Sequence, residues 1–213
     1  MQCLSDTEIL LSCGNNAKLY NREEMCEIAS FAATKPVIAA KANSRYIATG
    51  SDDRLARIYD RETIGLLHSL SGHKDGVRTV AFTSDSTRLV TGSFDNFIFI
   101  WLVSSGTQVA TLIGHTGTVY SCILTPEDNI VSCSFDRTVK VWETNKAVNK
   151  VEGHGARILG VASNSKKIVT ASRDKTLRVW NKHSFDTEIV LNGIKYIEMC
   201  ILMDRTCKQC DRM

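Results

Sequence analysis

Gly114-His115, Ser134-Phe135-Asp136 and Trp142 are the fixed points of a segment that occurs three times in this chain. In each copy, Ser-x-Asp follows Gly-His by about 20 residues, and a Trp lies six residues after the Asp. The three Trp residues are 41 and 38 positions apart (142 − 101 and 180 − 142). A period near 40 residues that is made of short strands is typical of propeller blades. The copies are Gly72-His73…Ser93-Phe94-Asp95…Trp101, Gly114-His115…Ser134-Phe135-Asp136…Trp142 and Gly153-His154…Ser172-Arg173-Asp174…Trp180.

Each copy contains four short runs that are rich in β-branched and aromatic residues and are bounded by turn formers. In the first full copy these runs start at Val77, Arg88, Asn96 and Thr107. Four strands in about 40 residues leave no room for a helix. Each copy therefore predicts a four-stranded antiparallel meander, whose strands are called a to d in chain order.

The pattern continues in weaker form on both sides of the full copies. Tyr59 takes the Trp position in residues 35–71, where no Gly-His precedes the copy, and Tyr20 takes it in residues 9–30. An apolar run at 194–203 is consistent with one more first strand. We expect a single array over 1–213, divided into 1–30 (strands b to d of a partial blade), blades at 31–72, 73–114, 115–153 and 154–193, a lone first strand at 194–203 and a tail at 204–213.

The recurring motif resembles that of the WD40 repeat family over about residues 9–203. The resemblance implies an all-β propeller of four-stranded antiparallel blades. It also implies a hydrogen-bonded tetrad in each blade, and buried imidazole and carboxylate groups do need such partners. The chain departs from the family after the Trp, where Leu102, Glu143 and Asn181 replace the usual Asp and only Tyr59-Asp60 keeps it. The implied tetrads are His73/Ser93/Asp95/Trp101, His115/Ser134/Asp136/Trp142 and His154/Ser172/Asp174/Trp180.

Ser, His and Asp are also the components of a nucleophilic triad. A catalytic triad occurs once and requires an oxyanion hole and a cleft, whereas this set occurs three times at equal spacing. We therefore interpret these residues as structural, assign no catalytic residue and expect no enzyme. A hydrolase is kept only as a remote alternative.

Family propellers mostly have seven blades, and four whole and two partial repeats are too few for such a ring. A partial or open array of about five blades, or a fragment of a longer propeller, is the favoured interpretation. Two alternatives remain. Residues 194–203 could supply the strand that residues 9–30 lack, which would close five blades, or the chain could pair with another chain.

Binding residues are expected on one rim of the array, because the narrow face of WD40 propellers commonly binds peptides and proteins. Phe94 and Phe135 precede the turn Asp in adjacent copies, where small or polar residues are usual. Aromatic and Arg side chains are common interface anchors. The prediction is a basic-aromatic surface for protein or peptide partners, in particular an acidic peptide with an apolar anchor; the alternative is that each Phe packs on its own blade. The expected partner-binding residues are Arg78, Phe94, Thr118, Tyr120, Phe135, Arg157 and Arg173.

The remaining features argue against other classes of protein. A net charge of +3 without a Lys/Arg run makes nucleic acid an improbable partner, and an RNA- or ribonucleoprotein-associated subunit is kept as the alternative function. No apolar run reaches the roughly 18 residues of a membrane span. The absence of a secretory signal and the strand-like surroundings of Cys13, Cys122 and Cys133 favour an intracellular protein, cytoplasmic or nuclear. Cys207 and Cys210 lack further ligands nearby, so no metal or cofactor is expected.

Overall fold

The computed structural model describes residues 2–3, 8–143, 146–182 and 184–194. These residues form twenty strands and no helix, so none of them forms a helical membrane span. The strands make five four-stranded antiparallel sheets. The predicted all-β fold of four-stranded antiparallel blades is therefore confirmed.

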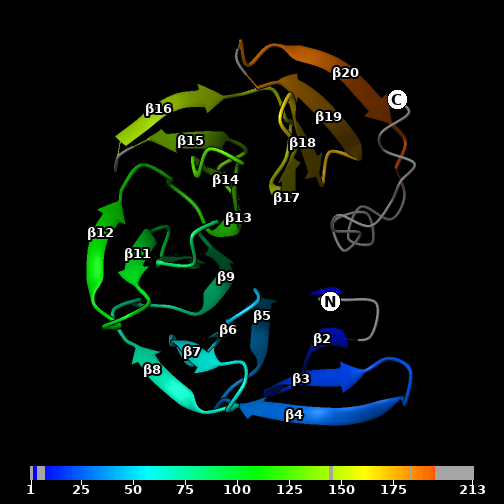
Figure 1. The fold of residues 1–213 in the computed structure, drawn as a ribbon. Helices are drawn as coiled ribbons and strands as arrows, with labels where there is room; N and C mark the ends of the chain where they lie inside the picture. The colour runs from blue at the N-terminus through cyan, green and yellow to red at the C-terminus, as the bar shows by residue number, and fades with distance from the viewer. Residues whose placement is uncertain (1, 4–7, 144–145, 183, 195–213) are drawn as a thin grey trace.

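Each sheet is one blade, and its four strands pair in chain order. In Figure 1 the blades follow one another around an arc, with the first strand of each blade towards the centre and the fourth strand on the outside. The arc is open, because no described strand of the fifth blade pairs with the first blade. The blades are β1–β4 (Gln2–Cys3, Glu8–Cys13, Asn16–Asn21, Cys26–Ala32), β5–β8 (Val37–Ala42, Tyr46–Ser51, Ala56–Asp60, Leu66–Leu70), β9–β12 (Val77–Phe82, Arg88–Ser93, Ile98–Leu102, Gln108–Leu112), β13–β16 (Val119–Leu124, Ile130–Ser134, Val139–Glu143, Lys146–Val151) and β17–β20 (Ile158–Ser163, Lys167–Ser172, Thr176–Asn181, Thr187–Asn192).

The first blade is more complete than the sequence indicated. Strand β1 pairs with β2 through Gln2↔Leu10 and Cys3↔Ile9. The Gln2 side chain also bonds to the main chain of Ala42 in the second blade, at 2.9 Å to the carbonyl and 2.8 Å from the amide. The prediction of strands b to d alone is therefore wrong, because a two-residue strand carries no readable periodicity. Strand β1 occupies the first-strand position of this blade, so residues 194–203 are not needed to fill it. Apart from Ile194, residues 194–203 and the tail at 204–213 lie outside the described residues.

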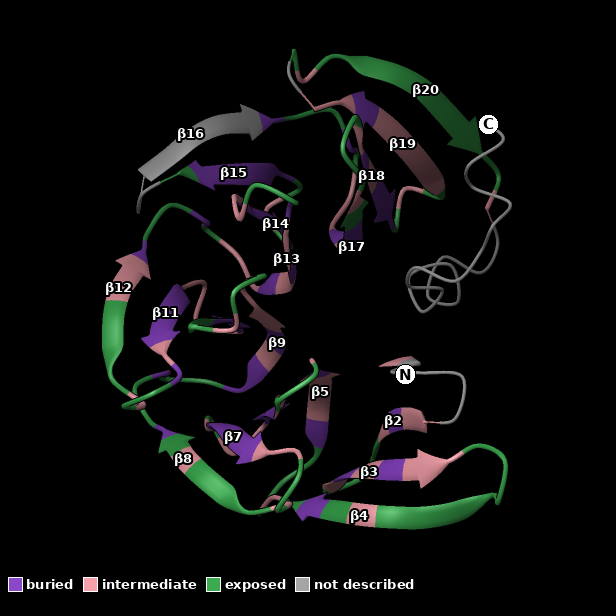
Figure 2. Cartoon of the chain, viewed as in Figure 1, coloured by how far each residue is buried: buried purple, intermediate pink, exposed green. Residues whose placement is uncertain are grey.

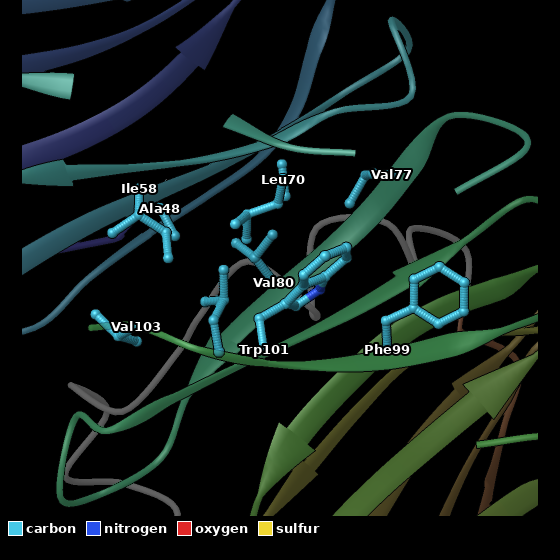
Figure 3. Packing of buried hydrophobic residues seen from close by; sticks show 10 residues of the cluster. Ala48, Ile58, Leu70, Val77, Val80, Phe99, Trp101 and Val103 are labelled. Atoms are coloured by element: carbon cyan, nitrogen blue, oxygen red, sulfur yellow. The ribbon is translucent and has the colours of Figure 1, made fainter. Parts of the chain in front are cut away.

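The hydrophobic core is divided among the interfaces between consecutive blades. Four clusters of buried residues each draw on two neighbouring blades. Figure 3 shows one of them, in which Leu70 of the second blade lies beside Val80 and Trp101 of the third. In Figure 2 the buried residues accordingly lie mainly on the inner strands, whereas the outer strands β4, β8 and β20 are mostly exposed. Each blade therefore depends on its neighbour for stability, as in other repeat proteins.

Small residues in the second strands allow neighbouring blades to approach closely. A Cβ added to Gly92 of β10 would lie 2.7 Å from Val119 Cγ1 of the next blade, and one added to Gly50 of β6 would lie 2.8 Å from Val77 Cγ1. Real Cβ atoms do not approach that closely, so the spacing of these blades requires glycine.

The fifth blade has no following blade among the described residues. Leu112 and Val151 are the last residues of β12 and β16, the outer strands of the third and fourth blades. They are 1% and 5% exposed. The matching residue of the fifth blade, Leu191 of β20, is 46% exposed, and Ile189 beside it is 47% exposed. Strand β20 is accordingly exposed along its whole length in Figure 2.

Polar links join the blades along the edge opposite the Gly-His loops. Both carboxylate oxygens of Asp128 accept from Ser84, from its amide at 3.0 Å and its hydroxyl at 2.7 Å. Asn43 Nδ2 donates to Ser86 Oγ at 2.9 Å, and Lys182 pairs with Glu127. These bonds connect consecutive blades and hold their relative orientation.

The residue after the Trp or Tyr shapes the turn between the third and fourth strands. Asp60 Oδ1 accepts from the amides of Glu62 and Thr63 at 3.0 and 2.8 Å. Asn21 makes the same pair of bonds in the first blade. An amide oxygen performs this function as well as a carboxylate, which explains why asparagine can replace the acid at this position.

Candidate functional site

The tetrads lie where the loop before each first strand meets the turn between the second and third strands. In the fifth blade, His154 Nδ1 lies 2.8 Å from Asp174 Oδ2 and His154 Nε2 lies 2.7 Å from Thr170 Oγ1. Trp180 Nε1 donates to the same hydroxyl at 2.8 Å. The third and fourth blades repeat this geometry with Thr91 and Ser132 as the shared hydroxyls.

The serine named in each tetrad is therefore wrong, although the His, Asp and Trp are brought together. Ser172 Oγ donates to the carbonyl of Ala156 at 3.0 Å and accepts from the amide of Asp174 at 3.2 Å. The serine two residues after the shared hydroxyl faces the same side of the strand, because side chains alternate with a period of two. It lies at the strand end and holds the turn, as do Ser93 and Ser134.

In the fifth blade, the directions of the pKa shifts favour one arrangement of the protons. Trp180 can only donate to Thr170 Oγ1, and a neutral imidazole beside an ionised carboxylate donates from Nδ1 to Asp174 and accepts the Thr170 hydrogen at Nε2. Burial lowers the pKa of His154 below its ordinary 6.5, and the charge of Arg178 adds to this effect, against the opposing influence of Asp174. Burial disfavours ionised Asp174, but hydrogen bonds from Thr176 and His154 outweigh it and lower the pKa of Asp174 to about 2.

This arrangement supports a structural role for the tetrads. The Thr91, Ser132 and Thr170 hydroxyls belong to residues with no exposed surface, so no substrate reaches them. A nucleophile needs access and a free oxyanion site. No catalytic role is assigned to these side chains.

The second blade has no Gly-His and uses an arginine instead. Arg57 Nη2 donates to Asp53 Oδ2 at 2.7 Å and Nη1 to Oδ1 at 3.3 Å. Thr34 adds bonds from its amide and hydroxyl to the same carboxylate. Burial opposes ionisation of Asp53, yet these bonds lower the pKa of Asp53 to about 2. Sequence spacing could not show this substitution, since Arg57 lies on a strand and the missing His on a loop.

Two groups of predicted partner-binding residues assemble on the rim formed by the tetrad loops. In the first, the Arg78 guanidinium lies over the Phe94 ring at 5.9 Å and over the Tyr120 ring at 5.4 Å. Phe94 belongs to the third blade and Tyr120 to the fourth, so Arg78 bridges two blades. All three side chains are half-buried. A Cβ added to Gly76 would lie 3.1 Å from Phe94, so this ring does pack partly on its own blade.

The second group surrounds a hollow of about 680 Å³ between the fourth and fifth blades. The Arg157 guanidinium lies 5.4 Å from the centre of the Phe135 ring, and Phe135 is 49% exposed. Phe135 therefore does not fold back into its blade. Arg173, also predicted, lines the hollow as well.

The structure adds residues to this set and gives Thr118 a different place. Arg137 and Thr116 line the hollow and were missed by the sequence analysis. Arg137 occupies the left-handed position of the turn, with φ 68°, as Asn96 does with φ 73° in the third blade; this recurring turn position was the signal available for it. Thr118 is half-buried and does not line the hollow, but its carbonyl accepts from the Phe135 amide at 2.9 Å and so orients that turn.

The part of the chain that the structure describes contains no group of three or more His, Cys, Asp or Glu side chains placed to hold a metal ion. Cys207 and Cys210 lie outside that part. Cys122 and Cys133 are buried, which raises the pKa of both thiols and favours the protonated forms.

The family of this chain follows from a comparison of its sequence with known protein families. The sequence model of the family described as WD domain, G-beta repeat matches residues 28–60, 65–101, 106–143 and 145–181, which is more than half of the chain. The chain belongs to the WD40 repeat family. Each matched segment ends at or just after the Trp or Tyr that anchors a tetrad or its counterpart.

Individual relatives share the repeats over part of their length. WD repeat-containing protein 37 of Xenopus laevis is 37% identical over 150 residues, which covers 62% of this chain and 30% of that protein. The U3 small nucleolar RNA-associated protein 15 homolog of Xenopus laevis is 29% identical over 147 residues, which covers 67% of this chain and 28% of that protein. The chain thus spans less than a third of the curated relatives it matches.

A solved structure shares the fold at lower sequence identity. The structure of U3-55K superimposes with a TM-score of 0.82 at 20% identity, covering 88% of this chain and 61% of that one. At this identity the likeness shows the propeller fold alone.

Proposed function

We propose that this WD40 array is a non-enzymatic scaffold that binds protein or peptide partners through the rim of its third, fourth and fifth blades. The observation that carries the proposal is the pair of arginine–aromatic groups on that rim, Phe94/Arg78/Tyr120 and Phe135/Arg157. Both groups span a boundary between blades and combine turn residues such as Phe94 and Phe135 with residues at or beside the start of a first strand, such as Arg78, Tyr120 and Arg157. Aromatic and arginine side chains dominate the energetics of protein interfaces.

The chemistry of the rim favours an acidic partner with an apolar anchor. Arg78, Arg157 and Arg173 supply positive charge, and the exposed Phe135 supplies an apolar surface. Thr118 orients the Phe135 turn through its carbonyl. We propose an intracellular location, cytoplasmic or nuclear, for this interaction, on the grounds of the cysteines that lie buried as thiols.

A second candidate is an RNA- or ribonucleoprotein-associated subunit. It is favoured by the named relative, which is a small nucleolar RNA-associated protein, and by the ability of aromatic and Arg side chains to stack on bases. The small net charge of +3 argues against it, because binding to the phosphate backbone requires many cationic contacts.

Affinity capture from cell lysate tests the proposal, with the full chain compared with a Phe94→Ala/Phe135→Ala variant. The matched control is Leu66→Ala/Val109→Ala, which truncates two exposed apolar residues on the outer strands β8 and β12. We expect a set of partners that the rim variant loses and the control keeps. Identical partner sets for the wild type and the rim variant would contradict the proposal. Partners released by ribonuclease and by moderate salt would support the second candidate.

A further inference from the structure

The hollow between the fourth and fifth blades is lined by more cationic than anionic side chains. Three guanidinium groups line it, from Arg137, Arg157 and Arg173, against one carboxylate, that of Asp136. Asp136 faces the blade interior: its Oδ2 lies 2.8 Å from His115 Nδ1, and its Oδ1 accepts from the Thr138 hydroxyl at 2.6 Å. Neither Arg137 nor Arg157 forms an ion pair with any residue that the structure describes.

The position of the Arg157 guanidinium over the Phe135 ring prepares that group for an oxyanion. A cation–π contact acts through the charge of the group and does not require its N–H donors. It also restricts the side chain before binding, so less conformational freedom is lost on binding. The main chain holds the pair in register, since the Arg173 amide donates to the Arg157 carbonyl at 3.0 Å and the Phe135 amide to the Thr118 carbonyl at 2.9 Å.

The number of guanidinium groups indicates the class of anion. One bidentate arginine is enough for a carboxylate, which carries a single charge and two oxygens. A phosphoryl group carries a charge of about −1.5 to −2 and three acceptor oxygens, and clusters of arginine are its usual partners. Phe135 beside the cluster offers an apolar surface to the residue that flanks the modified side chain.

We propose that this hollow binds a phosphorylated side chain of a peptide partner, with Arg157 and Arg137 as the anion-binding residues and Phe135 as the platform for an adjacent apolar residue. The inference rests on the proposed partner-binding function of the rim and specifies which partners it selects.

Single-stranded nucleic acid is the competing source of phosphate, and the rest of the rim argues against it. A nucleic-acid strand needs a continuous basic track along its backbone. Asp52 lies beside Gly76, where an added Cβ would meet its Oδ1 at 2.6 Å, and Asp75 is on the same loop. These acidic side chains interrupt the basic surface next to the Phe94 group, which suits one localised dianion better than a chain of phosphates.

The test measures binding of three peptide libraries to the full chain by fluorescence polarisation. The libraries are identical except for a central phosphoserine, glutamate or serine, and each has leucine or valine at the next position. We expect the phosphoserine library to bind about tenfold more tightly than the serine library, a difference that one well-formed charged contact accounts for. Arg157→Gln and Arg137→Gln should each remove most of that preference. Arg157→Lys, which keeps the charge but loses the planar fork, should weaken it.

The matched control is Arg88→Gln, an exposed arginine at the start of β10 on the opposite edge of the array, and it should leave the preference intact. Equal affinity for the phosphoserine and serine libraries would overturn the inference. So would equal affinity for phosphoserine and glutamate, or tight binding of oligouridylate that Arg157→Gln abolishes. If capture still shows partners that depend on Phe94 and Phe135 while phosphoserine gives no advantage, the rim function stands and the phosphate site fails. Unchanged thermal melting of each variant shows that a lost preference is not lost folding.

Discussion

The Thr170 hydroxyl lies 2.8 Å from the indole nitrogen of Trp180 and 2.7 Å from Nε2 of His154. One hydroxyl thus joins three segments of the fifth blade: its second strand, its third strand and the loop before its first strand. Trp180 can only donate, and the pKa values of His154 and Asp174 are both lowered, which favours a neutral imidazole and an ionised carboxylate. The chain of bonds then runs from the indole through Thr170 and the imidazole to Asp174. Removal of the hydroxyl would leave two buried nitrogens without a partner.

Thr170→Val should therefore destabilise the protein while keeping the shape of the side chain. A buried polar group left unpaired costs about 1–3 kcal/mol. We expect a loss of about 2 kcal/mol in the free energy of unfolding, measured by urea denaturation, and a fall in Tm of about 4–8 °C for a chain of this size.

Ser163→Ala is the control for this change, because the Ser163 hydroxyl is buried and has no partner among the described residues. Its removal should leave stability unchanged or slightly increase it. A Thr170→Val variant as stable as Ser163→Ala would show that the shared hydroxyl does not support the blade.

Gly92→Ala should weaken the interface between the third and fourth blades. The new methyl group would lie 2.7 Å from Val119 Cγ1 and 2.8 Å from Thr79 Cγ2, so the two blades would have to separate. Overpacking of this kind costs about 1–3 kcal/mol. Thermal unfolding followed by circular dichroism measures the effect.

Gly155→Ala is the matched control for the glycine experiment. A Cβ there would meet only Asp174 Cβ, at 3.8 Å, which is an ordinary contact. Its Tm should stay within about 2 °C of the wild type, as expected for a surface change of about 0.5 kcal/mol. Equal melting of the two variants would contradict the assignment of Gly92 to a close blade contact.

Sequence reasoning was reliable where the repeat itself carried the signal. The register of Tyr59, Trp101, Trp142 and Trp180 located four of the five blades, because the same strand lengths and turns recur around them. It failed where one strand position had to be chosen over another. Ser172 and Thr170 are both small hydroxyl residues on one side of β18. Only the position of the Trp180 indole in space shows that Thr170 is the one that accepts from it.

The site was partly predictable for a related reason. Phe135 was predicted because a large apolar side chain in a tight turn is unusual. Arg157 and Arg173 were predicted from their positions relative to the Gly-His and the turn Asp, and the structure places all three around one hollow. Arg137 was missed because a cationic residue in a turn is ordinary until its neighbours in space are known. Arg57 was missed because its partner Asp53 is bound from a strand in place of a loop.

Arg57→Met should destabilise the second blade by leaving the Asp53 carboxylate without its main partner. The side chains of the pair are 10% and 5% exposed, so water replaces the lost bonds poorly. We expect a loss of about 3 kcal/mol in the free energy of unfolding, as is usual when one member of a buried pair is removed. Arg57→Met/Asp53→Leu should recover part of this loss, because it removes the uncompensated charge. A double variant less stable than the single one by another 3 kcal/mol would contradict this account.

The acid sensitivity of the fold should follow from the tetrads. The pKa of Asp174 is lowered in the folded protein from 3.8 to about 2, so as the pH falls the unfolded chain takes up the proton first. The stability that Asp174 contributes is therefore complete above about pH 4 and is lost between about pH 4 and pH 2. His154 acts in the same direction at higher pH, because its pKa is also lowered on folding and the unfolded chain is protonated first below its ordinary 6.5.

Urea denaturation from pH 7 to pH 2 should show stability falling in both ranges. Asp174→Asn, which cannot be protonated, should be less stable at pH 7 and lose less stability between pH 4 and pH 2. Parallel pH profiles for this variant and the wild type would show that Asp174 is not held as a carboxylate by the tetrad.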